Sequence, residues 1–311
     1  MTILLYCVTY ACVVIFLLAC LMRVLQYART PLHLRWELYP VPHEASDRVK
    51  HGGSYFETSD WWAKPRHFNL WGEMKFMVPE MLFLKGLYEF NRKLWYRSFP
   101  FHFGLYLLMG TAALLFAGSA AAIFAPGLMA GSFGFIFQLL YTIIGTAGLI
   151  STMAGALGLL QRRLTDEKLK TYTTPGDIFN LLFFIVSLGV LSAGFLSKPP
   201  SAPDMLTLTK GLLTFDSVME IPLVTAVGLL LLGILVAYIP MTHMSHFIAK
   251  YFTYHAVRWD DSPNRKGGRI EAKLAECLAY RPRWAAAHVG ADGNKTWAQI
   301  ATANPVRESE K

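Results

Sequence analysis

The chain has 311 residues, of which 54% are hydrophobic and only 16% are charged. Soluble proteins carry about 25% charged residues, and here the apolar residues are concentrated in long blocks. This composition excludes an ordinary cytosolic enzyme, a disulfide-stabilised secreted domain and a disordered protein, and it predicts an integral membrane protein. The formal net charge of +8 would suit a nucleic-acid-binding protein, but in a membrane protein it can also reflect topology. The positions of the basic residues distinguish these two interpretations.

Long apolar stretches define the predicted membrane spans, because a spanning helix needs about 20 mostly apolar residues. Five stretches meet this requirement, at about residues 3–25, 99–124, 133–160, 178–196 and 221–247. The first has the length of a signal peptide, but no basic residue precedes it, no small-residue cleavage site follows it, and Arg23 lies at its far end. We therefore predict an all-α, five-helix membrane bundle whose first helix is a retained anchor.

The basic residues lie almost entirely on one side of these spans. Of the 29 Lys and Arg residues, 27 precede residue 98, lie between the third and fourth spans, or follow the fifth span. Lys198 and Lys210 are the two on the opposite side. By the positive-inside rule the basic side is the cytoplasm, so the N-terminus is expected outside and the C-terminus inside. The positive charge therefore reflects topology, and no nucleic-acid partner is predicted.

The spans divide the chain into four predicted regions. They are a first span at 1–27, a cytoplasmic or interfacial segment at 28–97, a four-span core at 98–254 and a cytoplasmic tail at 255–311. The second region closes with an amphipathic stretch, residues 71–95, that mixes aromatic and charged side chains and suits a helix lying in the membrane interface. The tail is too short for a sizeable core of its own, and we expect it to dock on another surface.

Histidines inside the predicted spans are informative, because ionisable residues are costly there. His102 lies near the start of the second span, while His243 and His246 lie three residues apart on one face of the fifth. With a rise of ~1.5 Å per residue, His102 and His246 lie roughly 6–8 Å inside the nearest boundary charges. Two histidines at matched depth on separate helices suit the two axial positions of one haem. Interfacial histidines hydrogen-bonded to neighbours are the alternative, and spacing alone does not choose between His243 and His246.

Motifs around the third, fourth and fifth spans carry a family resemblance. The third span ends in the basic pair 162–163, residues 173–177 read Thr-Thr-Pro-Gly-Asp, and residues 240–246 read Pro-Met-Thr-His-Met-Ser-His. In these motifs the five-span core resembles the gamma subunit of respiratory nitrate reductases. That family is a five-span b-type cytochrome that passes electrons from quinol to a cytoplasmic partner.

The resemblance implies a haem b with His102 and His246 as axial ligands, and it leaves His243 as a neighbour and alternative ligand. The family carries one further histidine in each of the second and fifth spans, where this chain has Ala112 and Gly228. Both ligands of the outer haem are therefore absent together. The resemblance thus implies a single haem on the inner side of the membrane.

Two further runs, residues 36–44 and 250–261, resemble the membrane cytochromes that accompany heterodisulfide-reductase-like iron–sulfur proteins, as in the sulfite-reduction membrane complex. This implies a subunit of a larger complex in the inner membrane of a bacterium or archaeon. It would transfer electrons between a quinone pool and a cytoplasmic iron–sulfur subunit. Two other classes compete with this function. One is a haem-free membrane anchor for a soluble redox enzyme, and the other is a transporter, although no inverted repeat is visible.

Quinone sites are apolar clefts with a few polar groups that exchange protons. Candidates near the expected inner haem are the polar side chains of the cytoplasmic segment together with the second histidine of the fifth-span motif: His33, Glu37, His43, Lys85 and His243. Each also has a structural interpretation. His33 and His43 lie in a proline-rich loop, and a lysine in an interfacial helix ordinarily extends its charge to water.

Overall fold

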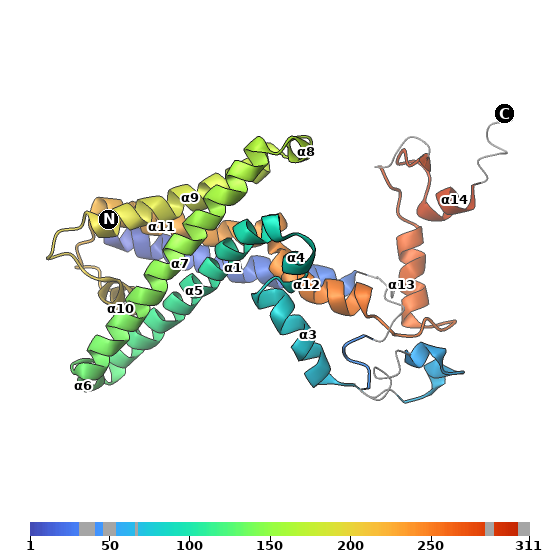
Figure 1. Cartoon of the computed structure of the whole chain (residues 1–311), viewed down its shortest axis with the longest axis horizontal. Helices are drawn as coiled ribbons and strands as arrows, with labels where there is room; N and C mark the ends of the chain where they lie inside the picture. The colour runs from blue at the N-terminus through green and yellow to red at the C-terminus, as the bar shows by residue number, and fades with distance from the viewer. Residues whose placement is uncertain (31–40, 46–53, 66–67, 284–288, 304–311) are drawn as a thin grey trace. The chain divides into compact units, whose positions relative to one another are not determined.

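The computed structural model contains only helices as regular elements within the residues it describes (Figure 1). Those residues are 1–30, 41–45, 54–65, 68–283 and 289–303. They form two compact units. The first unit comprises residues 1–20 and 73–245, and the second comprises residues 21–72 and 246–311. The predicted all-α class is confirmed.

Five helices in the described part of the chain are long and apolar enough to cross a membrane. They are α1 Thr2–Arg29, α5 Arg92–Phe124, α7 Ser132–Thr165, α9 Pro175–Leu196 and α11 Leu223–Tyr238, which a 3-10 turn extends to Met241. Each coincides with one of the predicted spans. The chain is therefore a multi-pass membrane protein, as its composition indicates.

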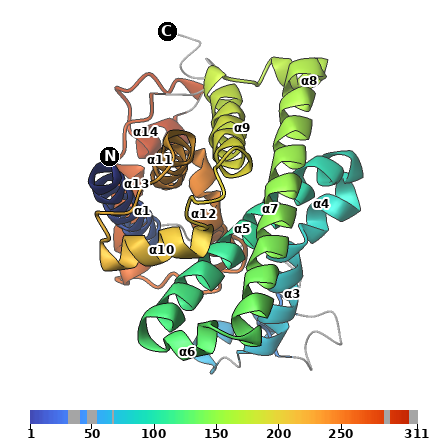
Figure 2. The ribbon, with the colours of Figure 1, turned by 90° about the vertical axis from the view of Figure 1, so that its left-hand side faces the viewer.

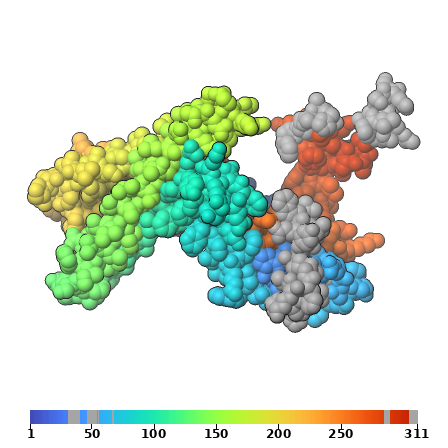
Figure 3. All heavy atoms as spheres, viewed as in Figure 1, coloured from blue at the N-terminus to red at the C-terminus, as the bar shows by residue number. Residues whose placement is uncertain are grey.

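Helices α5 and α7 pack closely through glycines, and they lie side by side in both ribbon views and in the space-filling view (Figures 1, 2 and 3). A Cβ on Gly104 would lie 2.4 Å from the backbone nitrogen of Thr152, and one on Gly155 would lie 2.3 Å from that of Phe101. Only glycine permits backbones to approach this closely. The contact holds the part of α5 that carries His102 directly against α7.

Helices α9 and α11 make a second close pair. A Cβ on Gly228 would lie 2.5 Å from Cα of Leu191, and one on Gly194 would lie 2.7 Å from Cα of Thr225. The Thr225 hydroxyl donates a hydrogen bond to the Gly194 carbonyl at 3.1 Å. Small residues on both helices therefore bring the two backbones into contact along their length.

The first half of α1 belongs to the core of the first unit. Leu5 and Tyr6 are buried against Leu208 of α10 (Met205–Thr214) and against Ile221. The Thr2 hydroxyl also donates a hydrogen bond to the carbonyl of Met219 at 2.8 Å. Apolar burial and one polar contact thus attach the first span to the segment that precedes α11.

The amphipathic stretch 71–95 is helical, but it forms three pieces rather than one. Helix α3 (Leu70–Leu82) ends before Leu84, whose φ of 51° lies in the left-handed region and breaks the helical path. Helix α4 (Lys85–Phe90) is followed by Asn91. The Asn91 side chain accepts a hydrogen bond from the Leu94 amide and so caps the start of α5. A single interfacial helix is therefore a wrong expectation for this stretch.

The fifth span is shorter than expected, because α11 ends at Tyr238. Pro240 has no amide hydrogen to continue the helix, and its ring clashes with the preceding turn. Two 3-10 turns follow, Ile239–Met241 and His243–Ser245, before α12 begins at His246 (His246–Phe252). His243 and His246 therefore do not share one face of a continuous helix, contrary to the expectation from their spacing.

In the second unit, α12 continues into a π-helical turn, Thr253–Arg258, and the buried Trp259 follows. This part of the tail packs on the segment that follows α1, where the Trp259 ring contacts the ring of His43 at 6.2 Å between centroids. The short remaining helices of the described residues are the 3-10 turns Tyr55–Glu57 and Trp61–Ala63, together with α6 Pro126–Met129, α8 Glu167–Lys170, α13 Arg269–Leu278 and α14 Trp297–Thr302. The tail therefore docks in part on its own chain.

Candidate functional site

His102 lies on α5 and is half-buried, with one ring nitrogen fixed by the helix itself. Its Nδ1 lies 2.8 Å from the carbonyl oxygen of Ser98, one turn earlier. A carbonyl only accepts, so Nδ1 carries the proton and donates it, and the lone pair lies on Nε2. This is the tautomer in which an imidazole binds a metal through Nε2 while its other nitrogen is held by a backbone carbonyl.

His243 belongs to a polar cluster in the first unit. Its Nε2 lies 3.7 Å from Oδ1 of Asp177 and 3.5 Å from Nδ2 of Asn180. The same Asp177 oxygen lies 3.4 Å from Nη2 of Arg163, and the Tyr238 hydroxyl donates to Oδ1 of Asn180 at 2.9 Å. The ends of α7 and α11 and the start of α9 thus bring an acid, a base and two hydrogen-bonding groups together.

The Thr-Thr-Pro-Gly-Asp motif builds the entry to this cluster. The Asp177 amide donates to the Thr174 hydroxyl at 3.3 Å, and the Thr174 amide donates to Oδ2 of Asp177 at 3.0 Å. This reciprocal capping box, with Pro175 in the first turn, starts α9 at this position. The motif therefore sets the orientation of the carboxylate that Arg163 and His243 contact.

The remaining predicted site residues are His246, Lys85, His33 and Glu37, together with His43. His246 is the first residue of α12, in the second unit, and its side chain is exposed. Lys85 is exposed on α4, where its Nζ lies 3.8 Å from Oε1 of Glu89, one turn later. His33 and Glu37 lie outside the residues that the structure describes.

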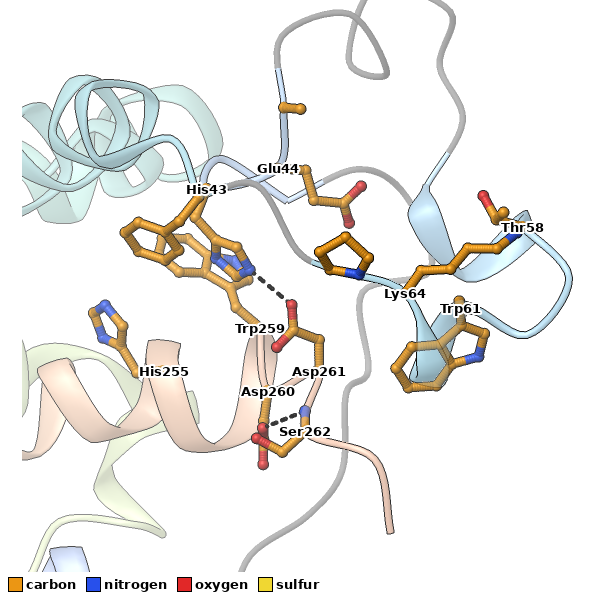
Figure 4. A pocket seen from close by; sticks show the side chains of 13 residues that line it. His43, Glu44, Thr58, Trp61, Lys64, His255, Trp259, Asp260, Asp261 and Ser262 are labelled. Atoms are coloured by element: carbon orange, nitrogen blue, oxygen red, sulfur yellow. Dashed lines mark hydrogen bonds and ion pairs between the residues drawn. The ribbon is translucent and has the colours of Figure 1, made fainter. Parts of the chain in front are cut away.

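His43 lies in the second unit, where it pairs with an acid that sequence reasoning missed. Its Nε2 lies 3.1 Å from Oδ2 of Asp261, and both side chains line a pocket of about 410 Å³ (Figure 4). Trp61 and Lys64 from the same segment as His43 and Trp259 from the tail line this pocket. The proline-rich run 36–44 pointed to His43, but no local signal paired it with the tail.

These features define a class of protein: a multi-pass, all-helical membrane protein with a metal-competent histidine in a spanning helix. The model of the nitrate reductase gamma subunit family matches residues 86–260, which is more than half of the chain. The chain therefore belongs to the nitrate reductase gamma subunit family, whose members are membrane cytochrome b electron-transfer subunits. Comparisons with curated proteins and with solved structures find no match.

The resemblance expects ligands of an outer haem at Ala112 and Gly228, and the residues at these two positions offer no side chain that binds iron. Ala112 is exposed on α5, and it has no group that binds iron. Gly228 lies where α9 and α11 touch, since even a Cβ there would meet Leu191 at 2.5 Å. Direct helix packing therefore occupies the side of α11 from which a second ligand would extend.

Proposed function

We propose that this chain is the b-type cytochrome subunit of a larger complex and carries electrons between a membrane quinone pool and a cytoplasmic iron–sulfur subunit. Family membership is the observation that carries this proposal, because the matched region includes both His102 and His246. When bound, haem b supplies one-electron oxidation and reduction at its iron. The resemblance of residues 250–261 to cytochromes of the heterodisulfide-reductase-like branch supports an iron–sulfur partner of that type.

We assign the axial ligands of the haem to His102 and His246. The hydrogen bond from Nδ1 of His102 to Ser98 supports ligation through Nε2. Nε2 of His243 instead faces Asp177 and Asn180, which supports a role beside the haem rather than on its iron. The last histidine of the family motif at the end of the fifth span corresponds to His246, which supports the same assignment.

A single haem per chain follows from the two replaced positions. The exposed side chain of Ala112 and the close contact at Gly228 both support the loss of the outer site. The second redox step of the subunit is then an exchange with the quinone or with the soluble partner, and the chain holds no haem-to-haem path across the membrane.

The proposed orientation in the membrane predicts the result of reporter fusions. We place the N-terminus outside and the C-terminus in the cytoplasm, because 27 of the 29 basic residues then face inward. Alkaline phosphatase fused after Pro126 or Pro203 is expected to be active, while fusions after Gly53, Asp166 or Gly293 are expected to be inactive. A green fluorescent protein fused at each site provides the opposite readout. Phosphatase activity at Gly293 would contradict the five-span topology.

Electron transfer from quinol tests the proposed function itself. The purified full chain, oxidised and kept anaerobic in detergent, is mixed with a short-chain naphthoquinol, and the absorbance of the reduced b-type band is followed. We expect the band to appear, because the electrons of the quinol pass to the haem iron. A haem that dithionite reduces but naphthoquinol leaves oxidised would contradict a quinone-linked function.

A further inference from the structure

The second unit contains a pocket whose lining lies outside the family match except for His255, Trp259 and Asp260. It has a volume of about 410 Å³, within the range of about 300–1,000 Å³ that is usual for sites of small ligands. The cytoplasmic segment contributes His43, Trp61 and Lys64, and the tail contributes Trp259 and Asp261 (Figure 4). Both aromatic rings and charged groups therefore face the same space.

His43 is the polar group of this pocket with an unmet hydrogen bond. Its side chain is 8% exposed, and its Nε2 donates to Oδ2 of Asp261 at 3.1 Å. A carboxylate only accepts, so Nε2 carries the proton, and in the neutral imidazole the lone pair then lies on Nδ1. Among the described residues Nδ1 is buried without a hydrogen-bond partner. Such an acceptor is costly to leave unsatisfied, and a ligand hydroxyl would satisfy it.

The walls of the pocket indicate the shape and charge of the ligand. Phe68 stacks on the His43 ring with 5.2 Å between centroids and 17° between planes, and it is itself 62% exposed. Rotation of the exposed Phe68 side chain would open space at the edge of the imidazole, where the Nδ1 lone pair lies in the ring plane. Asp260 and Asp261 disfavour an anion, whereas Lys64 disfavours a cation. A ligand that matches the aromatic walls and the mixed charges of the pocket is an uncharged aromatic ring with a hydroxyl group at its edge.

The pocket also lies along the helix that begins at the proposed iron ligand. Within the second unit, α12 starts at His246 and continues through the π-helical turn to Arg258, directly before Trp259. The step of nine positions from His246 to His255, which lines the pocket, corresponds to about 14 Å at ~1.5 Å per residue. A redox-active ring in this pocket would therefore lie beside the same short helical segment that carries the proposed ligand His246.

We propose that this pocket binds the ring of a quinol, with Nδ1 of His43 accepting a hydrogen bond from one quinol hydroxyl and Asp261 fixing the tautomer that makes this bond. The inference rests on the proposed function, which supplies a quinone-linked subunit. It adds the residues of the quinol site and a preference for the reduced carrier. A quinone carbonyl has no hydrogen to offer to Nδ1, so the oxidised ring binds more weakly.

Two probes of nearly the same shape, neither of which forms a quinone without losing a methyl group, test this preference. They are 4-methoxy-1-naphthol, which carries one hydroxyl donor, and 1,4-dimethoxynaphthalene, which carries none. Binding of each to the full chain in detergent is measured by isothermal calorimetry. We expect the naphthol to bind about tenfold more tightly, which corresponds to one satisfied buried acceptor. Equal affinity for the two probes, or no binding of either, would overturn the proposal.

Three variants locate the effect. His43→Phe keeps the flat ring but removes both nitrogens, so the preference for the naphthol should disappear. Asp261→Asn no longer fixes the tautomer, because an amide both donates and accepts, so the preference should fall toward one. Asp292→Asn is the matched control, since this exposed carboxylate of the tail contacts Asn294 and does not line the pocket. A preference that survives in Asp261→Asn would contradict the assignment even if His43→Phe fails to fold.

The same preparations separate this inference from the proposed function. A chain that contains haem but shows no preference between the probes contradicts the quinol pocket alone. A chain that prefers the naphthol but contains no haem contradicts the cytochrome assignment alone. The haem content of His43→Phe and Asp261→Asn is expected to equal that of the unmodified chain, because neither side chain is proposed as an iron ligand.

Discussion

Replacement of His102 or of His246 by alanine is expected to abolish haem incorporation. A low-spin haem b that loses one of two axial nitrogens loses much of its attachment to the protein. The haem absorbance per milligram of purified protein should fall to the background of a preparation without haem. Helix content, measured by circular dichroism, should stay close to that of the unmodified chain.

His243→Ala is the matched control for these two variants, because it removes a histidine from the same motif. We expect it to retain haem with a shifted reduction potential, since the loss of the imidazole removes one charged neighbour of Asp177 and leaves the ion pair with Arg163 in place. Loss of haem in His243→Ala together with its retention in His246→Ala would reverse the assignment of the second ligand.

Gly104→Ala is expected to destabilise the bundle strongly. The added Cβ would lie 2.4 Å from both the backbone nitrogen and the hydroxyl oxygen of Thr152, and 2.8 Å from the carbonyl oxygen of Gly148. The backbone atoms of α7 can move only together with their helix, so α5 and α7 must separate. We expect this to lower the free energy of unfolding by about 1–3 kcal/mol or more. The midpoint of thermal unfolding in detergent should fall clearly, and haem binding at His102 should weaken with it.

Gly110→Ala tests the same substitution at a site on the same helix where a Cβ would meet no atom within 4 Å. Because alanine favours helix over glycine by about 0.5–1 kcal/mol, this variant should be as stable as the unmodified chain or slightly more stable. Equal midpoints for Gly104→Ala and Gly110→Ala would show that the α5–α7 contact does not limit stability.

The membrane helices could be predicted from the sequence because a span needs only length and apolarity, and both are local properties. The details that depend on single residues were harder to predict. Pro240 ends α11 before His243, although the sequence pattern predicts a span that continues to residue 247. Leu84 adopts a left-handed conformation that leucine rarely takes, so nothing in its type signals the break between α3 and α4.

For the candidate site, too, local features could be predicted from the sequence and contacts between distant residues could not. His102 could be identified because an ionisable side chain inside an apolar span is conspicuous in one dimension. The contact between His43 and Asp261 joins residues 218 positions apart. The contact of His243 with Asp177 joins a 3-10 turn that follows α11 to the first turn of α9. Such pairs depend on how helices and loops come together in space. The sequence therefore predicts single residues of the site better than their partners.

The most direct test of the account is the amount and type of haem in the purified full chain. Haem iron is measured per polypeptide, and a reduced-minus-oxidised spectrum is recorded on the same sample. The account predicts one iron per chain and the absorption bands of a b-type haem. A chain without haem would instead be a membrane anchor, and two irons per chain would require a second haem with ligands other than those assigned here. Either result would contradict the account.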